Sequence, residues 1–194
     1  MNTPKSAGKK EREVGKEMRR QLLLLLFAVL VALVIAVLAY GFFLLNVETA
    51  CHLASNSMYM RIWPPNLQDA DVLLGAGYAR HDSCILLSTR SVISAVMLIY
   101  FIYLLVSQVW VKDTSYVPKL IPISVFLFLG YLYTSTEVIS TAPASIYSIS
   151  THSGVEVNLI KSYVKICGLY IGLSLFIQRM FALLRVKFNT GRER

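Results

Sequence analysis

The chain has 194 residues, of which 56% are hydrophobic and only 15% are charged, and its mean hydropathy is +0.58. Because soluble domains carry about 25% charged residues, this composition excludes an ordinary soluble domain and predicts one small all-α membrane protein. The net charge of +8 does not indicate a nucleic-acid partner, since most of the basic residues flank apolar segments.

The first span is preceded by a charged tail. Residues 1–20 hold seven basic and three acidic side chains, and so little apolar content predicts a disordered tail that becomes helical only near the membrane. Residues 22–45 contain no charge, and about 20 apolar residues suffice to cross a bilayer. This run exceeds the roughly 7 to 15 residue core of a cleaved signal peptide. We therefore expect a retained first span at 21–45.

Two polar segments are expected to form outer loops. The longer one covers 46–84 and contains two short strand candidates, 59–63 and 72–74, in which branched, aromatic and other apolar residues cluster. The shorter one covers 143–160 and is rich in Ser and Thr. These two loops would form the part of the protein that lies outside the membrane on the non-cytosolic side.

The three cysteines are split between a loop and an apolar segment. Cys51 and Cys84 both lie in the loop 46–84, and Cys167 lies in an apolar run. If the loop is extracytosolic, Cys51 and Cys84 can form a disulfide that closes it. The odd count leaves Cys167 as a small buried apolar residue.

Three further apolar segments complete a predicted bundle of four transmembrane helices. We expect these spans at 85–110, 120–142 and 161–184, followed by a short tail at 185–194. The transmembrane domain then covers residues 21–184 with the two outer loops included. A single disulfide-closed extracellular loop between the first and second spans is the distinguishing feature of this predicted fold.

The distribution of Lys and Arg predicts the orientation. The tail 1–20, the turn 111–119 and the stretch 179–194 contain seven, two and five basic residues, whereas the outer loops with their border contain three, namely Arg61, Arg80 and Lys161. Basic residues concentrate on the cytoplasmic side of membrane proteins. Fourteen against three predicts that both termini are cytosolic, in the plasma membrane or an endomembrane.

Three spans carry an internal charge at a similar depth. Arg90 in the second span, Glu137 in the third and Lys165 in the fourth each lie within about six residues of the outer boundary, or roughly 6 to 9 Å at helical rise. Ionisable side chains inside a bilayer are expensive and usually pair with one another. We therefore predict an ion cluster in which Glu137 bridges Arg90 and Lys165.

Three interpretations of this cluster remain open. It could be a neutral packing lock that fixes the order of the helices, which we favour, or part of a pathway for an ion or substrate. Alternatively, Arg90 and Lys165 could simply extend to the outer headgroups. Gly168 and Gly172, one turn apart and on the face of Lys165, form a G-x-x-x-G pattern that allows a neighbouring helix to approach closely.

Motifs for catalysis or metal binding are not evident. The three histidines fall in the outer loops without the ligand spacing of a closed metal site, and phosphate-binding, nucleophile-elbow and metalloprotease patterns are missing. We therefore expect no metal, no cofactor and no catalytic residue, and a protein that is not an enzyme.

One family resembles this layout. The run Cys51-His52-Leu53, the long loop after it, and Cys84-Ile85-Leu86 leading directly into the second span resemble the tetraspanning transmembrane protein 179 family. The resemblance implies four spans with two loop cysteines. The Trp…Gly-Leu-Trp…Cys…Cys pattern typical of claudin-like proteins does not occur in the first loop.

These observations favour a non-enzymatic role. We expect a membrane scaffold or auxiliary subunit whose partners are the lipid bilayer and another integral membrane protein or a second copy of itself. A small oligomeric channel or transporter that uses Arg90, Glu137 and Lys165 is the second hypothesis. A lipid-binding or lipid-modifying protein that uses the same layer is the third.

Overall fold

The computed structural model describes residues 4–75, 77–110, 138–139, 149–150 and 153–190. The described elements are α1 (Pro4–Leu45), α2 (Val47–Ser55), α3 (Ser57–Met60), α4 (Pro65–Gly75), α5 (Arg80–Trp110), β1 (Val138–Ile139), β2 (Ile149–Ser150) and α7 (Val155–Thr190). The described chain is therefore helical, apart from two strands of two residues that pair in parallel.

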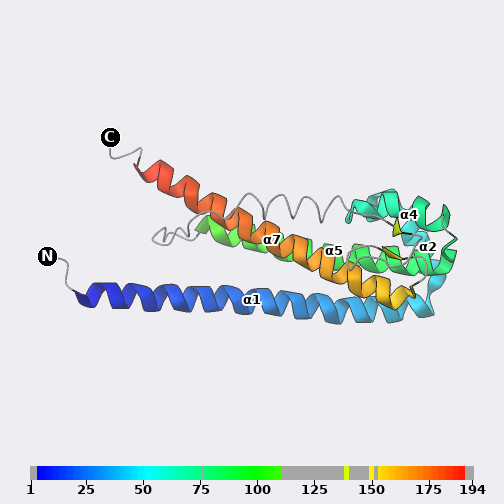
Figure 1. Ribbon diagram of the computed structural model, residues 1–194, viewed down its shortest axis with the longest axis horizontal. Coiled ribbons are helices and arrows are strands. Elements are labelled where there is room, and N and C mark those ends of the chain that lie inside the picture. The colour runs from blue at the N-terminus through cyan, green and yellow to red at the C-terminus, as the bar shows by residue number, and fades with distance from the viewer. Residues whose placement is uncertain (1–3, 76, 111–137, 140–148, 151–152, 191–194) are drawn as a thin grey trace.

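Three long helices lie side by side and form the body of the molecule (Figure 1). Helix α5 packs against both α1 and α7. The face of α1 that meets them is lined by Ala28, Ala32 and Ala36, which are buried and recur every four residues, so they lie on one side of the helix. These small side chains allow the neighbouring helices to approach closely, and the larger Phe43 fills the space nearer the end of α1.

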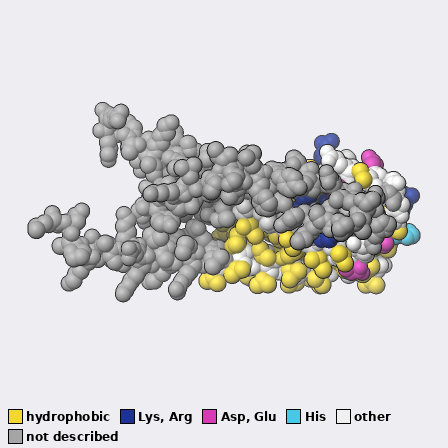
Figure 2. Space-filling view, viewed as in Figure 1, with side chains coloured by type: hydrophobic (Ala, Val, Ile, Leu, Met, Phe, Trp, Pro, Cys, Tyr) yellow, Lys and Arg dark blue, Asp and Glu magenta, His cyan; other side chains and the backbone are white. Residues whose placement is uncertain are grey.

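Two described helices, Leu23–Leu45 within α1 and Arg80–Val106 within α5, are long and apolar enough to cross a membrane. Much of the apolar surface of α1 is exposed, and it forms a hydrophobic band along one face of the molecule (Figure 2). Such a surface suits a lipid environment, because soluble monomers rarely expose apolar patches this extensive.

The other two expected spans are only partly described. The expected fourth span, 161–184, lies within α7. Most of the expected third span, 120–142, lies outside the described residues, and its residues 138–139 form β1 instead of helix. The prediction of a helix is therefore wrong for residues 138–139, because they pair with β2, which lies in the segment that leads into α7.

The segment 46–84 is folded as helices, so both strand candidates are wrong. Residues 57–60 form α3, whose first turn is capped by Asn56, with Oδ1 accepting from the backbone N–H groups of Met58 and Tyr59. Residues 72–74 lie in α4, which starts at Pro65, a residue suited to the first helical position. These local helix signals, together with packing against α5, outweigh the strand propensity of the side chains.

The N-terminal tail also differs from the prediction. Helix α1 begins at Pro4 and continues without interruption into the apolar run, so a disordered tail is wrong. The tail is rich in Lys, Arg and Glu, which are good helix formers. Extending an existing helix avoids the cost of nucleation, which explains why a polar segment next to a long helix can be helical.

Candidate functional site: a buried ion pair between α4 and α5

The centre of the candidate site is an ion pair formed by Arg90 of α5 and Asp69 of α4. Arg90 Nη1 lies 2.7 Å from Asp69 Oδ2, and the two side chains are only 2% and 1% exposed. Arg90 therefore meets a carboxylate supplied by the segment between the first two long helices. That segment, α2 to α4 (residues 47–75), is called the α2–α4 segment below.

A second polar residue of α4, Asn66, also bonds to α5. Asn66 precedes Asp69 by three residues, so the two side chains share one face of α4. Asn66 Nδ2 donates to the backbone oxygen of Leu87 at 3.1 Å and to Ser91 Oγ at 2.9 Å. Because Asn66 is fully buried, these bonds fix the register of α4 against α5.

Further hydrogen bonds tie the rest of the α2–α4 segment to the same helix. Ser88 Oγ donates to the backbone oxygen of Ala50 at 2.8 Å, and Ser94 Oγ donates to that of Ile62 at 2.8 Å. The hydroxyl of Tyr59 donates to the backbone oxygen of Ser88 at 2.9 Å. Ser88 and Ser94, which are less than two helical turns apart on α5, are thus each matched to a backbone carbonyl of the α2–α4 segment.

Helix α7 closes the other side of this layer. Lys165 is buried and interacts electrostatically with both Arg90 and Asp69. One turn and a half further along α7, the hydroxyl of Tyr170 lies 3.0 Å from Ser94 Oγ, within hydrogen-bonding distance. The two basic residues predicted to share a layer therefore do lie close enough to influence each other, together with Asp69.

The third member of the predicted cluster, Glu137, lies outside the described residues, so its bridging role stays a prediction. Its chain neighbour Val138 lies in β1, and β1 packs against α4, the helix that carries Asp69. If Glu137 shares the layer, Glu137→Lys should strongly reduce the yield of folded protein and Glu137→Gln should reduce it less. Size-exclusion chromatography in detergent measures this yield, and unchanged yield for both variants would contradict the bridge.

Sequence reasoning missed Asp69, although a signal was present. Asn66 and Asp69 follow Pro65 at helical spacing, and a proline in the first turn with polar residues three apart is typical of a helix with one polar face. The sequence predicts that these residues lie in an outer loop above the membrane, whereas the carboxylate of Asp69 lies beside Arg90.

The ion pair is surrounded by incompletely satisfied polar atoms. Within the described residues, Asn66 Oδ1, Asp69 Oδ1 and Arg90 Nε are buried and have no hydrogen-bond partner. Each unpaired buried group carries a desolvation cost of about 1 to 3 kcal/mol. The pair is consequently poor as a source of net stability, and it makes the fold sensitive to the loss of either partner.

A disulfide joins Cys51 of α2 to Cys84 near the start of α5, which confirms the predicted bridge. The bridge spans a sequence separation of 33 residues and encloses the α3 and α4 helices. Cys167 is the free cysteine of the described part of the chain and is buried. The α2–α4 segment is thus fastened covalently at one end and by Asp69 further along.

Bonds between α1 and α7 fix the relative heights of the long helices. Tyr40 donates to Glu156 Oε1 at 2.6 Å, and Tyr163 donates to the backbone oxygen of Val29 at 2.6 Å. The hydrogen bond from Tyr40 lowers the pKa of Glu156 below its ordinary value. These contacts set the end of α1 beside the beginning of α7.

The predicted glycine packing motif is not seen in contact with another described element. A Cβ atom added at Gly168 would meet no described atom within 4 Å outside its own helix, and Gly172 is half-buried. A close helix approach at Gly168 and Gly172 therefore stays a prediction. Within the same described part of the chain, no three His, Cys, Asp or Glu side chains come together as metal ligands.

In comparisons with known proteins, no family model matches the chain, and neither a curated protein nor a solved structure matches it. The resemblance to the transmembrane protein 179 family therefore stays a prediction from the loop cysteines. The buried pair, the disulfide and the apolar surface are the features of the chain that bear on function.

Proposed function

We propose that this chain is a non-enzymatic integral membrane protein that acts as a scaffold or auxiliary subunit for another membrane protein. The observation that carries the proposal is the pairing of Arg90 with Asp69 inside the chain at 2.7 Å. A charge used for permeation or catalysis must be reachable by its substrate, whereas a fully buried, internally paired charge holds elements together. The charged layer is best explained as a packing lock.

The membrane placement has three supports. Two described helices are long and apolar enough to span, and α1 exposes large apolar side chains along much of its length. The Cys51–Cys84 disulfide favours an oxidising compartment on its side of the membrane. Because basic residues concentrate on the cytoplasmic side of membrane proteins, we propose four spans with both termini in the cytosol. We also propose that the chain is related to the transmembrane protein 179 family.

A channel or transporter is the second candidate, and a specific observation favours it. Asn158, Ser162 and Lys165 are buried and lie on one face of α7, at spacings of four and three residues. Together with the buried serines of α5 they give the interior a polar column, which is typical of proteins that handle ions or polar solutes. A lipid-binding protein is the third candidate.

Reconstitution separates these candidates. We expect purified protein in liposomes to produce no flux of K⁺, Cl⁻ or protons above that of empty vesicles, and cross-linking in native membranes to capture one defined integral membrane partner. The matched control is the same preparation carrying Lys165→Gln, which removes a charge from the polar column. Flux through the unaltered protein that decreases in the Lys165→Gln variant would contradict the scaffold proposal and support the channel or transporter.

A further inference from the structure

We propose that the α2–α4 segment lies within the outer half of the bilayer as a re-entrant element and binds phospholipid. Its exposed apolar residues would contact acyl chains, and Arg61 would pair with a headgroup phosphate. This inference rests on the membrane placement proposed above. It changes the first outer loop from a cap above the bundle into part of the membrane domain.

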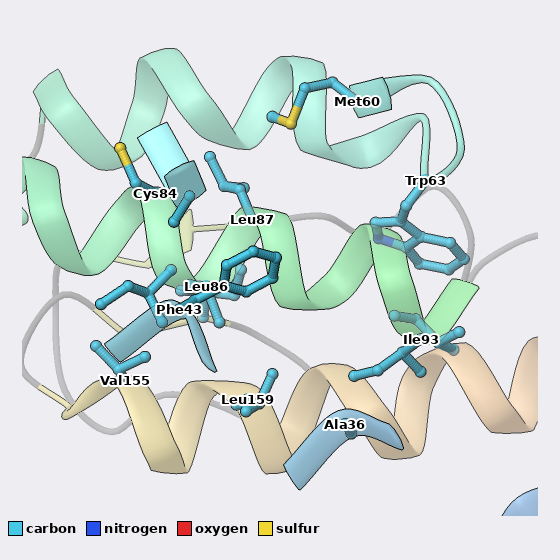
Figure 3. Close-up of a cluster of buried hydrophobic side chains, with 14 of the residues drawn as sticks. Ala36, Phe43, Met60, Trp63, Cys84, Leu86, Leu87, Ile93, Val155 and Leu159 are labelled. Carbon is cyan, nitrogen blue, oxygen red and sulfur yellow. The ribbon is translucent and has the colours of Figure 1, made fainter. Parts of the chain in front are cut away.

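The depth of the segment follows from its position along α5. Figure 3 shows Trp63, at the tip of the segment, lying beyond Ala36 on the side away from Phe43. Ala36 is nine residues before Leu45, the outer end of the apolar run of α1, which is roughly 13 Å of helix. If α1 crosses the membrane through this run, Trp63 lies well inside the hydrocarbon layer.

The hydrogen bond from Ser94 to Ile62 independently places the tip far along the long helices. Ser94 follows Arg80, the first residue of α5, by fourteen residues, or roughly 21 Å of helix. Ser94 also lies within hydrogen-bonding distance of Tyr170 of α7. The tip of the α2–α4 segment is therefore beside the middle of the long helices and not beside their ends.

The backbone at this tip is satisfied as a bilayer requires. The N–H groups of Arg61, Ile62 and Trp63 donate to backbone oxygens one turn earlier, and the next two residues are prolines, which have no N–H. The carbonyls of residues 62, 63 and 64 all accept hydrogen bonds. Irregular backbone is tolerated at membrane depth only when its polar groups are paired or shielded by protein.

The outward face of the segment carries large apolar side chains beside exposed polar ones, among them Ser57 and Gln68. Met58, Leu67 and Val72 are 81%, 41% and 48% exposed. Arg61 is also exposed, and an arginine at this depth can extend its side chain toward the phosphate layer while its methylene groups stay in the apolar region. Asp71 lies further along α4, toward the outer end of the helices, where water is nearer.

Site-directed spin labelling measures the depth directly. The full chain, with its disulfide intact and Cys167→Ala as background, carries one nitroxide at position 67, at 37 on the exposed face of α1, or at 79 just before α5. In phosphatidylcholine vesicles we expect positions 67 and 37 to collide several-fold more with oxygen, relative to a water-soluble nickel chelate, than position 79.

The outcomes distinguish the two proposals. Nickel access at 67 as high as at 79, with 37 still protected, would overturn the re-entrant segment and leave the membrane placement standing. Nickel access at all three positions would overturn the membrane placement and this inference together.

The headgroup contact is tested by lipid retention. Native mass spectrometry of the detergent-solubilised protein should show several-fold less bound phosphatidylglycerol for Arg61→Gln than for the unaltered chain, and near-normal binding for Arg61→Lys. Arg80→Gln, an exposed arginine at the outer end of α5, is the matched control. Equal retention in Arg61→Gln, or full displacement of the lipid by inorganic phosphate, would overturn phospholipid as the occupant.

Discussion

Asp69→Asn should destabilise the folded protein by about 3 to 5 kcal/mol, because it leaves the guanidinium of Arg90 buried without its countercharge. The side chain is nearly isosteric, so lost packing contributes little to this effect. Denaturant unfolding in detergent micelles, followed by circular dichroism, measures the loss. The cost falls on a buried charge, so raising the salt concentration should not relieve it.

The matched control is Asp71→Asn, the same substitution on the exposed face of the same helix. A surface change of this kind is expected to alter stability by no more than about 0.5 kcal/mol. The double variant Asp69→Leu with Arg90→Met removes both charges and should recover most of the lost stability, since apolar pairs of similar size often replace buried ion pairs without cost. Equal losses for Asp69→Asn and Asp71→Asn would contradict the packing lock.

The proximity of Arg90 and Lys165 could be predicted from the sequence, but the depth of the carboxylate that pairs with Arg90 could not. Counting residues along uninterrupted apolar runs places Arg90 and Lys165 at comparable heights, because helical rise per residue is constant. The structure brings both residues near one carboxylate. That carboxylate, Asp69, belongs to a segment whose depth no residue count can give, since it depends on how the chain folds back against α5.

The two strand candidates show a related limit. Residues 59–63 and 72–74 are rich in side chains that suit strands, yet strand propensity expresses packing against a neighbouring strand and has little meaning without one. Helical capping by Asn56 is local, so it could have been recognised. The bonds from Ser88 and Ser94 to the backbone of the segment are long-range and could not.

The disulfide was predictable because it needed only two premises, the presence of two cysteines in one loop and the expected placement of that loop outside the cytosol. The positive-inside rule supplied the second premise as an expectation. The order of the helices in space has no such local signature. It depends on the alanine face of α1 and the polar face of α5 finding their complements, which only the folded structure displays.

Replacing both bridging cysteines, Cys51→Ala with Cys84→Ala, should lower the free energy of unfolding by about 3 to 4 kcal/mol. The bridge closes a loop with a sequence separation of 33 residues. Removing the bridge increases the conformational entropy of the unfolded chain, and this gain lowers the stability of the folded protein. Unfolding with and without a reducing agent measures the effect. Cys167→Ala is the control, because its thiol is unpaired with another cysteine and its variant should keep the full response to reductant.

Combining this change with Asp69→Asn tests whether the two attachments hold one element. The disulfide fastens the beginning of the α2–α4 segment, and the ion pair fastens its last helix. If the segment detaches from α5 as a unit, local opening without the bridge also lets water and detergent headgroups reach Arg90, which relieves the cost of its missing partner. The combined loss should then be smaller than the two separate losses together, as expected for coupled sites. Strictly additive losses would show that the segment has no independent opening and that its helices are held separately by α5.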